Sequence, residues 1–326
     1  MPGGLRRGSV SAVGIFLGRR LVYSAVVLFG VLVVTFAIVQ LVPGDPIRLA
    51  LGTRYNPEAH QALLEASGLD RPLHEQFFSY VAGALTGDLG VSFRSGQPVT
   101  VLLLDRLPAT LSLALVGIGI ALLISVPAGI WAGLREGRIS DGIVRVTSQF
   151  GVSVPDFWMG LLLITLFSGI LGWLPPSGYA PIGEDFTGWA KRVILPALTV
   201  GLVAAAILTR YVRAAVLEVA HTGFVRTARS KGLPERVVTR RHIVRNALVP
   251  VLTIVGIQLA TIASGVIVVE VVFAWPGLGR LVYEAVSARD YALIQGSVLL
   301  IAVLFLAVNL IVDVCYALVD PRIRLS

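Results

Sequence analysis

Six long blocks of apolar residues, separated by polar segments, dominate the pattern of this 326-residue chain. Most of the blocks approach or exceed the roughly 20 residues that a helix needs to cross the hydrocarbon core of a bilayer. The pattern therefore predicts an all-α integral membrane protein with six transmembrane helices. The expected spans cover residues 21–42, 111–131, 157–174, 194–208, 247–269 and 293–319, and a helical segment from residue 142 leads into the third.

The first and fourth blocks need separate interpretation. The first is longer than the roughly 7–15 apolar residues of a signal peptide, and no small-residue cleavage site follows it. It is therefore expected to remain as a membrane helix. The fourth block is short, but it can continue through Tyr211 and Val212 if the side chains of Arg210 and Arg213 extend to the membrane interface.

Lysine and arginine residues predict the orientation. Eighteen of them lie at the two termini and in the connections after the second and fourth spans, and nine lie in the remaining connections, spread over more residues. Positive charge is enriched on the cytoplasmic side of membrane proteins. Both termini are therefore expected in the cytoplasm.

Composition changes this picture little. Hydrophobic residues make up 56% of the chain and charged residues 14%, against roughly 25% charged in soluble domains. The net charge of +8 is attributed to cytoplasmic loops and lipid headgroups, and no nucleic-acid partner is expected. A single cysteine, Cys315, and four scattered histidines predict neither a disulfide framework nor a metal site.

Two connections carry local helix signals. In the first, Asn56 with Pro57 can start a helix that Gly68 ends, and Asp70 can cap a second helix that Gly87 ends. This external loop is a candidate for contact with a soluble partner, or it only covers the helix ends. In the second, nine cations lie between residues 210 and 245 around a short amphipathic stretch, which either docks into a groove of another protein or lies on lipid headgroups.

The second connection also carries a resemblance to a known family. The stretch Phe-Val-Arg-Thr-Ala-Arg-Ser-Lys-Gly-Leu at 224–233 and the stretch Arg-His-Ile-Val-Arg-Asn-Ala-Leu-Val-Pro at 241–250 resemble the cytoplasmic loop of binding-protein-dependent ABC permeases, in the dipeptide, oligopeptide and nickel branch. Further motifs of that branch are similar to residues 41–46, 87–92, 107–111, 153–158, 270–279 and 320–324.

The resemblance implies a type I ABC importer fold and a division of the chain. Residues 1–43 would form the N-terminus and first span, 44–107 an external helical loop, 108–319 the permease core with a cytoplasmic coupling loop at 214–246, and 320–326 the tail. It also implies one half of a peptide pathway in a bacterial plasma membrane. Nickel chelates, glutathione and oligosaccharides are alternative cargoes of the same machinery.

The implied partners are a second homologous permease, two cytoplasmic ABC ATPases, an extracytoplasmic solute-binding protein and membrane lipid. ATP and Mg would be bound by the ATPases, because this chain lacks the P-loop pattern GxxxxGK[ST] and is expected to have no cofactor or catalytic residue. The helix around residues 224–233 would act as a rigid lever that transmits closure of the ATPases to the spans. Phe224 and Val225 would form its apolar plug. The expected coupling residues are Phe224, Val225, Arg226, Thr227, Ala228, Arg229, Lys231, Gly232 and Leu233.

Two departures from the family pattern bear on that helix. Gly223 replaces a common aspartate, and Phe224 replaces the usual tyrosine, so polar contacts of the helix are in doubt but its apolar docking is not. Asp156 also replaces a small polar residue that is more usual after Pro155.

Polar residues in or near the spans are candidates for lining the pathway, because polar groups at membrane depth are commonly functional. The candidates are Gln149, Ser153, Asp156, Thr209, Gln258, Thr261, Ser264, Asn309 and Asp313. Asn309 and Asp313, four residues apart, can instead pair with a neighbouring helix. A secondary transporter and an intramembrane enzyme are the rival classes, but neither inverted repeats nor a catalytic dyad with a supporting motif is found.

Overall fold

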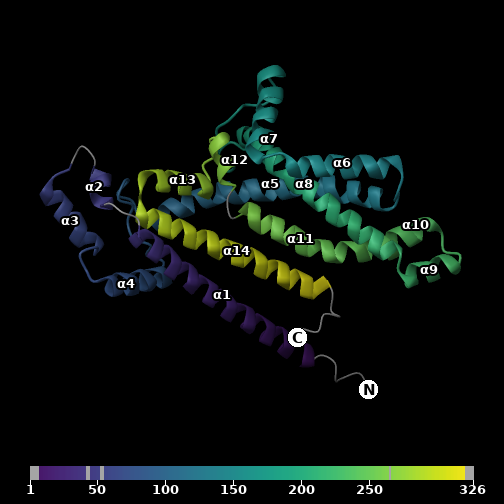
Figure 1. Cartoon of the computed structure of the whole chain (residues 1–326), viewed down its shortest axis with the longest axis horizontal. Helices are drawn as coiled ribbons and strands as arrows, with labels where there is room; N and C mark the ends of the chain where they lie inside the picture. Colours follow the sequence, from purple (N-terminus) through teal and green to yellow (C-terminus); the bar gives the residue numbers. More distant parts are fainter. Residues whose placement is uncertain (1–6, 42–44, 52–54, 264–265, 320–326) are drawn as a thin grey trace. The chain divides into compact units, whose positions relative to one another are not determined.

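The computed structural model describes residues 7–41, 45–51, 55–263 and 266–319, and these residues form helices joined by short loops (Figure 1). Within these ranges, the only β-pairing is an isolated bridge between Val91 and Pro98. The helices are α1 (Arg7–Leu41), α2 (Pro46–Leu51), α3 (Pro57–Ser67), α4 (Leu73–Thr86), α5 (Val99–Gly133), α6 (Ile139–Ser153), α7 (Asp156–Leu163), η2 (Ile164–Ile170), α8 (Phe186–Ala220), α9 (Gly223–Ser230), α10 (Glu235–Val237), η3 (Val238–Val244), α11 (Arg245–Ala263), α12 (Ile267–Val272), α13 (Leu278–Ala288) and α14 (Tyr291–Val319), with η2 and η3 in π-helical geometry.

Among the described residues, five helices are long and apolar enough to cross a membrane. A sixth span results if α6 and the helix Asp156–Ile170 are counted together, although they are bent by 104°. The bend lies at Val154 and Pro155, where the backbone is extended because a residue before proline avoids the helical region. The predicted all-α fold is confirmed, and six spans are present if this bent pair is counted as one, with the break just before the predicted start of the third span at residue 157.

The bounds of several predicted spans differ from the helices. The second span begins earlier than residue 111, because α5 starts at Val99, within the predicted external loop at 44–107. The fourth is not short, because α8 runs from Phe186 to Ala220 without interruption, with Pro196 inside it. The fifth ends at Ala263 and not at residue 269, and a separate helix, α12, follows it. The prediction gave the fourth span as residues 194–208, with a possible continuation through Val212, and it merged two apolar helices into the fifth.

The described residues form two compact units. The first consists of the described residues up to 108 and residues 276–306, and the second of residues 109–275 and 307–319, without 264–265. In the first unit, Asn56 caps α3 by accepting a hydrogen bond from the Glu58 amide, and Gly68 and Gly87 end α3 and α4 in left-handed conformation, as predicted. The prediction that Asp70 caps α4 is wrong, because α4 starts at Leu73 after Pro72.

Helix α8 is the central helix of the second unit. It packs against α6, α7, α11 and α12. Of the most apolar 18-residue stretch of α8, 67% is buried inside the structure, compared with 11% for the corresponding stretch of α1. Small residues also let α8 approach α5 closely, because a Cβ added at Gly201 of α8 would lie only 2.9 Å from the Gly117 carbonyl oxygen of α5. Helices in lipid associate through close van der Waals packing of small residues, since lipid tails are as apolar as the side chains.

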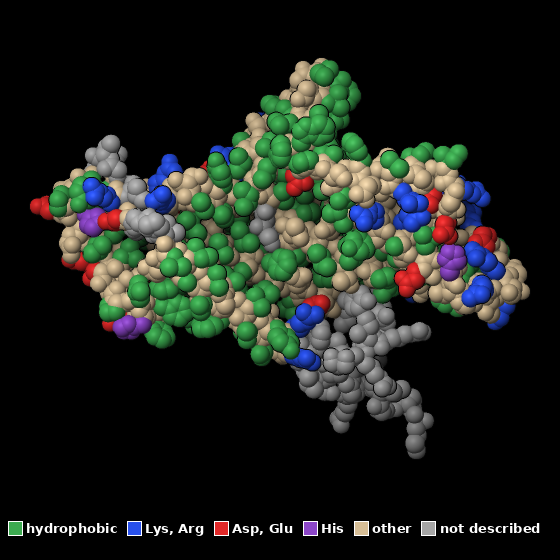
Figure 2. Space-filling model, viewed as in Figure 1, with side chains coloured by type: hydrophobic (Ala, Val, Ile, Leu, Met, Phe, Trp, Pro, Cys, Tyr) green, Lys and Arg blue, Asp and Glu red, His purple; other side chains and the backbone are tan. Residues whose placement is uncertain are grey.

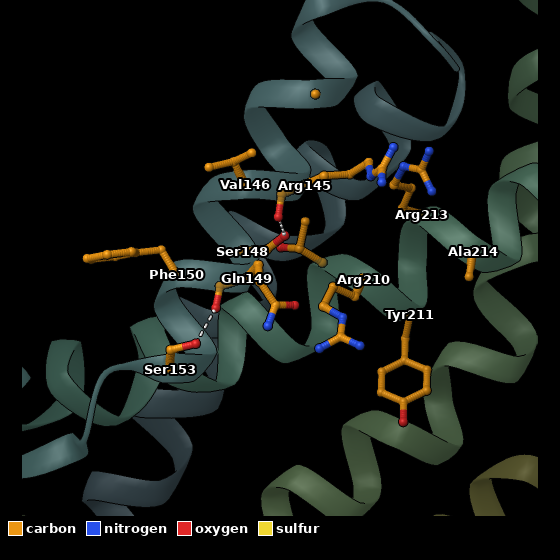
Figure 3. Close-up of a pocket in the computed structure, with 12 residues that line it drawn as sticks. Arg145, Val146, Ser148, Gln149, Phe150, Ser153, Arg210, Tyr211, Arg213 and Ala214 are labelled. Carbon is orange, nitrogen blue, oxygen red and sulfur yellow. Dashed lines mark hydrogen bonds between the residues drawn. The ribbon is translucent and has the colours of Figure 1, made fainter.

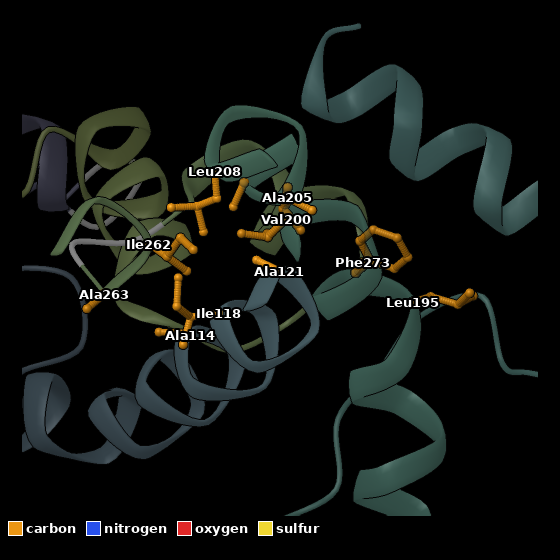
Figure 4. Packing of buried hydrophobic residues seen from close by; sticks show 12 residues of the cluster. Ala114, Ile118, Ala121, Leu195, Val200, Ala205, Leu208, Ile262, Ala263 and Phe273 are labelled. Carbon is orange, nitrogen blue, oxygen red and sulfur yellow. The ribbon is translucent and has the colours of Figure 1, made fainter. Parts of the chain in front are cut away.

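The core of the second unit follows from the same packing. Ala114 and Ala121 of α5 lie with Ala205 and Leu208 of α8 and with Phe273 in one buried cluster (Figure 4). The loop after α12 is held to the start of this core, because the buried Trp275 ring donates from Nε1 to the Ala109 carbonyl oxygen at 2.9 Å. The bond thus joins the loop after α12 to α5.

Some predicted features fall outside the described residues. These are the candidate pathway residue Ser264, residue 42 at the predicted end of the first span, and the tail at residues 320–326. Residues 270–292, expected only as the connection between the fifth and sixth spans, contain the end of α12 and all of α13.

Candidate functional site

The segment predicted to couple to ATPases forms a separate short helix, α9, between α8 and α10. Val225 and Ala228 on α9 are buried against Val212 and Val216 of α8 and Ile243 of η3. This apolar contact fixes α9 to its own chain. The inward side of the helix is therefore used for anchoring.

The outward side of α9 carries the exposed residues. Phe224 is 48% exposed, although it is large and apolar, and Arg226 and Thr227 of the same helix are also exposed. In Figure 2, charged side chains gather around α9 and α10 at one end of the second unit. The expectation that Phe224 and Val225 together form a surface plug needs correction, since Val225 points into its own chain and leaves only Phe224 exposed.

Gly232 closes α9 with a defined hydrogen-bond pattern. Its φ is +75°, and its amide donates to the Arg229 carbonyl oxygen at 2.9 Å, while the Leu233 amide donates to the Ala228 carbonyl oxygen at 3.4 Å. This pair of bonds is the Schellman arrangement, which glycine favours because it adopts positive φ at little cost. The sharp turn that the sequence predicted at this position is present.

An ion pair spans this turn. Arg229 donates to both carboxylate oxygens of Glu235, with the shortest distance 2.7 Å from Nη2 to Oε1. The hydrogen bonds to Glu235 raise the pKa of Arg229, although burial acts in the opposite direction. Of the predicted coupling cations, Arg229 thus lies against the chain's own carboxylate, and Arg226 and Lys231 are exposed.

A cavity of about 940 Å³ lies between α6 and α8 in the second unit (Figure 3). It contains two predicted pathway residues, Gln149 and Ser153, which lie four residues apart on one side of α6. Thr209, also predicted, contributes from α8. The remaining lining residues are Gly142, Arg145, Val146, Ser148, Phe150, Arg210, Tyr211, Arg213 and Ala214.

One wall of the cavity is held by a buried ion pair. Asp141 is 1% exposed and accepts hydrogen bonds from Arg213, at 2.5 Å from Nε and 2.8 Å from Nη2. The Gly137 amide also donates to this carboxylate at 3.2 Å. Because the pair joins α6 to α8, it fixes the separation of the two helices that form the cavity.

The other predicted pathway residues lie elsewhere and do not line this cavity. Asp156 is in the first turn of α7. Gln258 and Thr261 are on α11, where Thr261 donates to the Ile257 carbonyl oxygen, and Asn309 and Asp313 are on α14.

Sequence reasoning missed the three arginines of the cavity as a group. Arg210 and Arg213 were interpreted only as residues at a span end, and Arg145 only as part of a charge count. The sequence contained one signal for this group. Arg145 lies on one helical segment and Arg210 and Arg213 lie on another, so the three side chains can meet if the two segments pack side by side. That packing is not visible in the sequence.

Comparisons with known proteins agree with this architecture. The family description "Binding-protein-dependent transport system inner membrane component" matches residues 125–325, and the N-terminal description of the same system matches residues 14–114. The chain is 39% identical to a di/tripeptide transport system permease protein, DppB, of Pseudomonas aeruginosa, over 95% of this chain and 98% of that protein. It is 38% identical to the dipeptide permease DppB of Escherichia coli K12, with the same coverage, and 40% identical to the glutathione permease GsiC of E. coli O6:H1, over 94% of this chain and 97% of that protein.

Solved structures show a similar fold. Two crystal forms of the inward-facing methionine ABC transporter MetNI give TM-scores of 0.52 and 0.55 at 19% and 20% identity, and each alignment covers 67% of this chain and 96% of the solved chain.

Proposed function

This chain belongs to the family of binding-protein-dependent transport system inner membrane components, and we propose that it is the permease subunit of an ABC importer for small peptides. The names of its relatives support the cargo, since they are permeases for dipeptides, tripeptides and glutathione, which is itself a tripeptide. In this proposal, the chain forms half of a pathway with a second, homologous permease. A solute-binding protein would deliver the peptide from outside the cell.

Energy would come from two ATPase subunits that bind ATP and Mg, because a permease of this family works as part of a complex. We place α9 and both chain termini in the cytoplasm, in agreement with the excess of arginine and lysine in these segments. The exposed Phe224 would enter a groove of an ATPase subunit, and the buried Val225 and Ala228 would carry the motion to α8. This division of α9 into an exposed and an anchored side is the observation that supports the coupling role.

The test replaces Phe224 with aspartate in the complete transporter, reconstituted with its partner permease, ATPases and binding protein. Val237→Asp is the matched control, because Val237 is another exposed apolar residue of the same segment, 38% exposed on α10. We expect Phe224→Asp to abolish ATP-dependent peptide uptake and peptide-stimulated ATP hydrolysis, while Val237→Asp keeps both. Normal uptake by Phe224→Asp in a correctly assembled complex would exclude the plug.

A second measurement tests the sidedness. Thr227→Cys, introduced after Cys315→Ser has removed the native cysteine, should react with a membrane-impermeant maleimide only when the cytoplasmic face is accessible. Reaction in intact cells from the outside would refute the cytoplasmic placement of α9.

A further inference from the structure

We propose that the cavity between α6 and α8 binds the carboxylate group of the peptide in transit, with Arg210 and Arg145 as its cationic partners. The inference rests on the proposed function, because it names the part of the substrate that this site recognises.

The charge of the cavity wall is the first argument. Three arginines, Arg145, Arg210 and Arg213, line the cavity, and Asp141 is the carboxylate that pairs with one of them. Asp141 is bound at both oxygens by Arg213 and is buried, so it is not available to neutralise a second cation fully. Within the described ranges, neither Arg145 nor Arg210 forms an ion pair. An excess of positive charge therefore faces the cavity.

The orientation of the Arg210 side chain is the second argument. Figure 3 shows the Arg210 side chain and the Gln149 side-chain amide extending into the same space from α8 and α6. Both residues are exposed, so a ligand can reach them. A guanidinium group recognises a carboxylate through two parallel hydrogen bonds, and an amide N–H beside it can donate a third.

Polar groups on the cavity wall favour a peptide over a lipid. The hydroxyls of Ser153 and Thr209 donate to the carbonyl oxygens of Gln149 and Ala205 at 3.1 and 2.7 Å, so their oxygens remain available as acceptors. Peptide N–H groups and an α-ammonium group match these acceptors, whereas a lipid acyl chain would leave them without partners. The volume of about 940 Å³ is also within the range of small-molecule sites, and it exceeds what one phosphate group needs.

The site should be weak, which suits a transport pathway. Arg210 and Arg145 are exposed to water, which screens the attraction of each for a carboxylate. A pathway site must bind well enough for the solute to enter and weakly enough for it to leave. The geometry thus predicts a transient contact and not a tight binding site.

The experiment measures protection of a cysteine in the cavity. Ser153→Cys is placed in a Cys315→Ser background, the complete transporter is reconstituted in nanodiscs, and the rate of maleimide labelling is followed. Dialanine and its C-terminal amide are the two probes, which differ only in the carboxylate. Thr147→Cys is the matched control, because Thr147 is exposed on the same helix but does not line the cavity.

We expect dialanine to slow labelling of Ser153→Cys more than its amide does. Arg210→Gln should remove this difference, which is roughly two- to fivefold for one charged contact near water. Arg240→Gln, which removes an exposed cation of η3 outside the cavity, should leave it unchanged. Equal protection by the acid and the amide, or protection that survives Arg210→Gln, would overturn the proposal.

Two further arms separate the alternatives. The first arm compares labelling of Ser153→Cys in nanodiscs of phosphatidylcholine alone and in nanodiscs that also contain phosphatidylglycerol. If the anionic lipid slows labelling and peptide has no effect, the cavity binds lipid phosphate and the proposal is overturned. Uptake of dialanine by the reconstituted wild-type transporter is measured in parallel. ATP-dependent uptake without protection would refute the cavity site alone, whereas absence of peptide uptake would refute the proposed function.

Discussion

The contact between α5 and α8 offers a sharp test of how this fold is held together in lipid. Gly129 and Gly133 lie four residues apart on α5, in the small-residue spacing that lets membrane helices approach closely. A Cβ added at Gly129 would lie 2.6 Å from the Cβ of Val212 and 2.9 Å from the Thr209 carbonyl oxygen on α8. We predict that Gly129→Ala destabilises the protein, although alanine is the better helix former.

The magnitude follows from the distances and from a matched control. Ordinary contacts of a Cβ begin at 3.4 Å, so the helices must separate by about 0.8 Å at Gly129 or the side chain of Val212 must shift. Overpacking of this kind typically costs about 1–3 kcal/mol. Gly119, on the same helix, has no atom within 4 Å of an added Cβ. Gly119→Ala gains the same helix propensity, up to about 1 kcal/mol, without the clash, so the difference between the two variants isolates the clash.

The measurement is the free energy of unfolding of the purified chain in mixed micelles, titrated with sodium dodecyl sulfate and followed by tryptophan fluorescence. We expect Gly129→Ala to be about 1–3 kcal/mol less stable than Gly119→Ala. If the two variants agree within about 0.5 kcal/mol, the close approach of α5 and α8 is not what the distances indicate.

Two further predictions concern charged groups. Asp141→Asn leaves the partly buried Arg213 without its carboxylate and should lower the free energy of unfolding by about 3 kcal/mol in the same titration. Glu284→Gln breaks the exposed ion pair with Arg280 and should lower it by less than about 1 kcal/mol. Equal losses in the two variants would contradict the difference in burial between the two pairs. Burial opposes ionisation of Asp45, but hydrogen bonds from the Arg48 amide and the His60 ring lower the pKa of Asp45 below its usual 3.8. The ionised carboxylate therefore stabilises the start of α2 above that value and stops doing so as the pH falls through the lowered pKa. Amide hydrogen exchange at Arg48 should show protection relative to Asp45→Ala at about pH 6 that is lost as the pH falls through the lowered pKa, and protection that persists in the protonated state would refute the assignment.

The predictions that the structure confirmed rest on local signals. Asn56 and Gly68 mark the ends of α3 because a side-chain cap and a left-handed glycine act within a few residues. The turn at Gly232 follows for the same reason. Asp70 misled the prediction, since it satisfies the sequence pattern of a cap while Pro72 sets the actual start of α4. Local patterns thus located the ends that a cap or a left-handed glycine marks, but Asp70 shows that a cap pattern alone does not fix where a helix starts.

The candidate site was predictable only on each helix separately. Gln149 and Ser153 share one side of α6 because four residues make about one turn, so their presence in one cavity follows from the sequence. The inward direction of Val225 does not, because helical spacing says which residues share a side and not which side faces the protein. The meeting of Arg145 with Arg210 depends on α6 packing against α8, which no local pattern specifies.

The charges on α8 explain why hydropathy gave its span too short. A window of apolar residues ends at Arg210 if each arginine is counted as a group that needs water. In the structure the helix continues to Ala220, because Arg213 is neutralised by the buried Asp141 and Arg210 faces a cavity. Both cations are thus accommodated by the protein, and neither marks an end of the helix. An arginine that interrupts an apolar block, with a carboxylate such as Asp141 on the neighbouring helix, is therefore evidence for a polar site between the two helices, and it should be tested as a site before it is treated as a boundary.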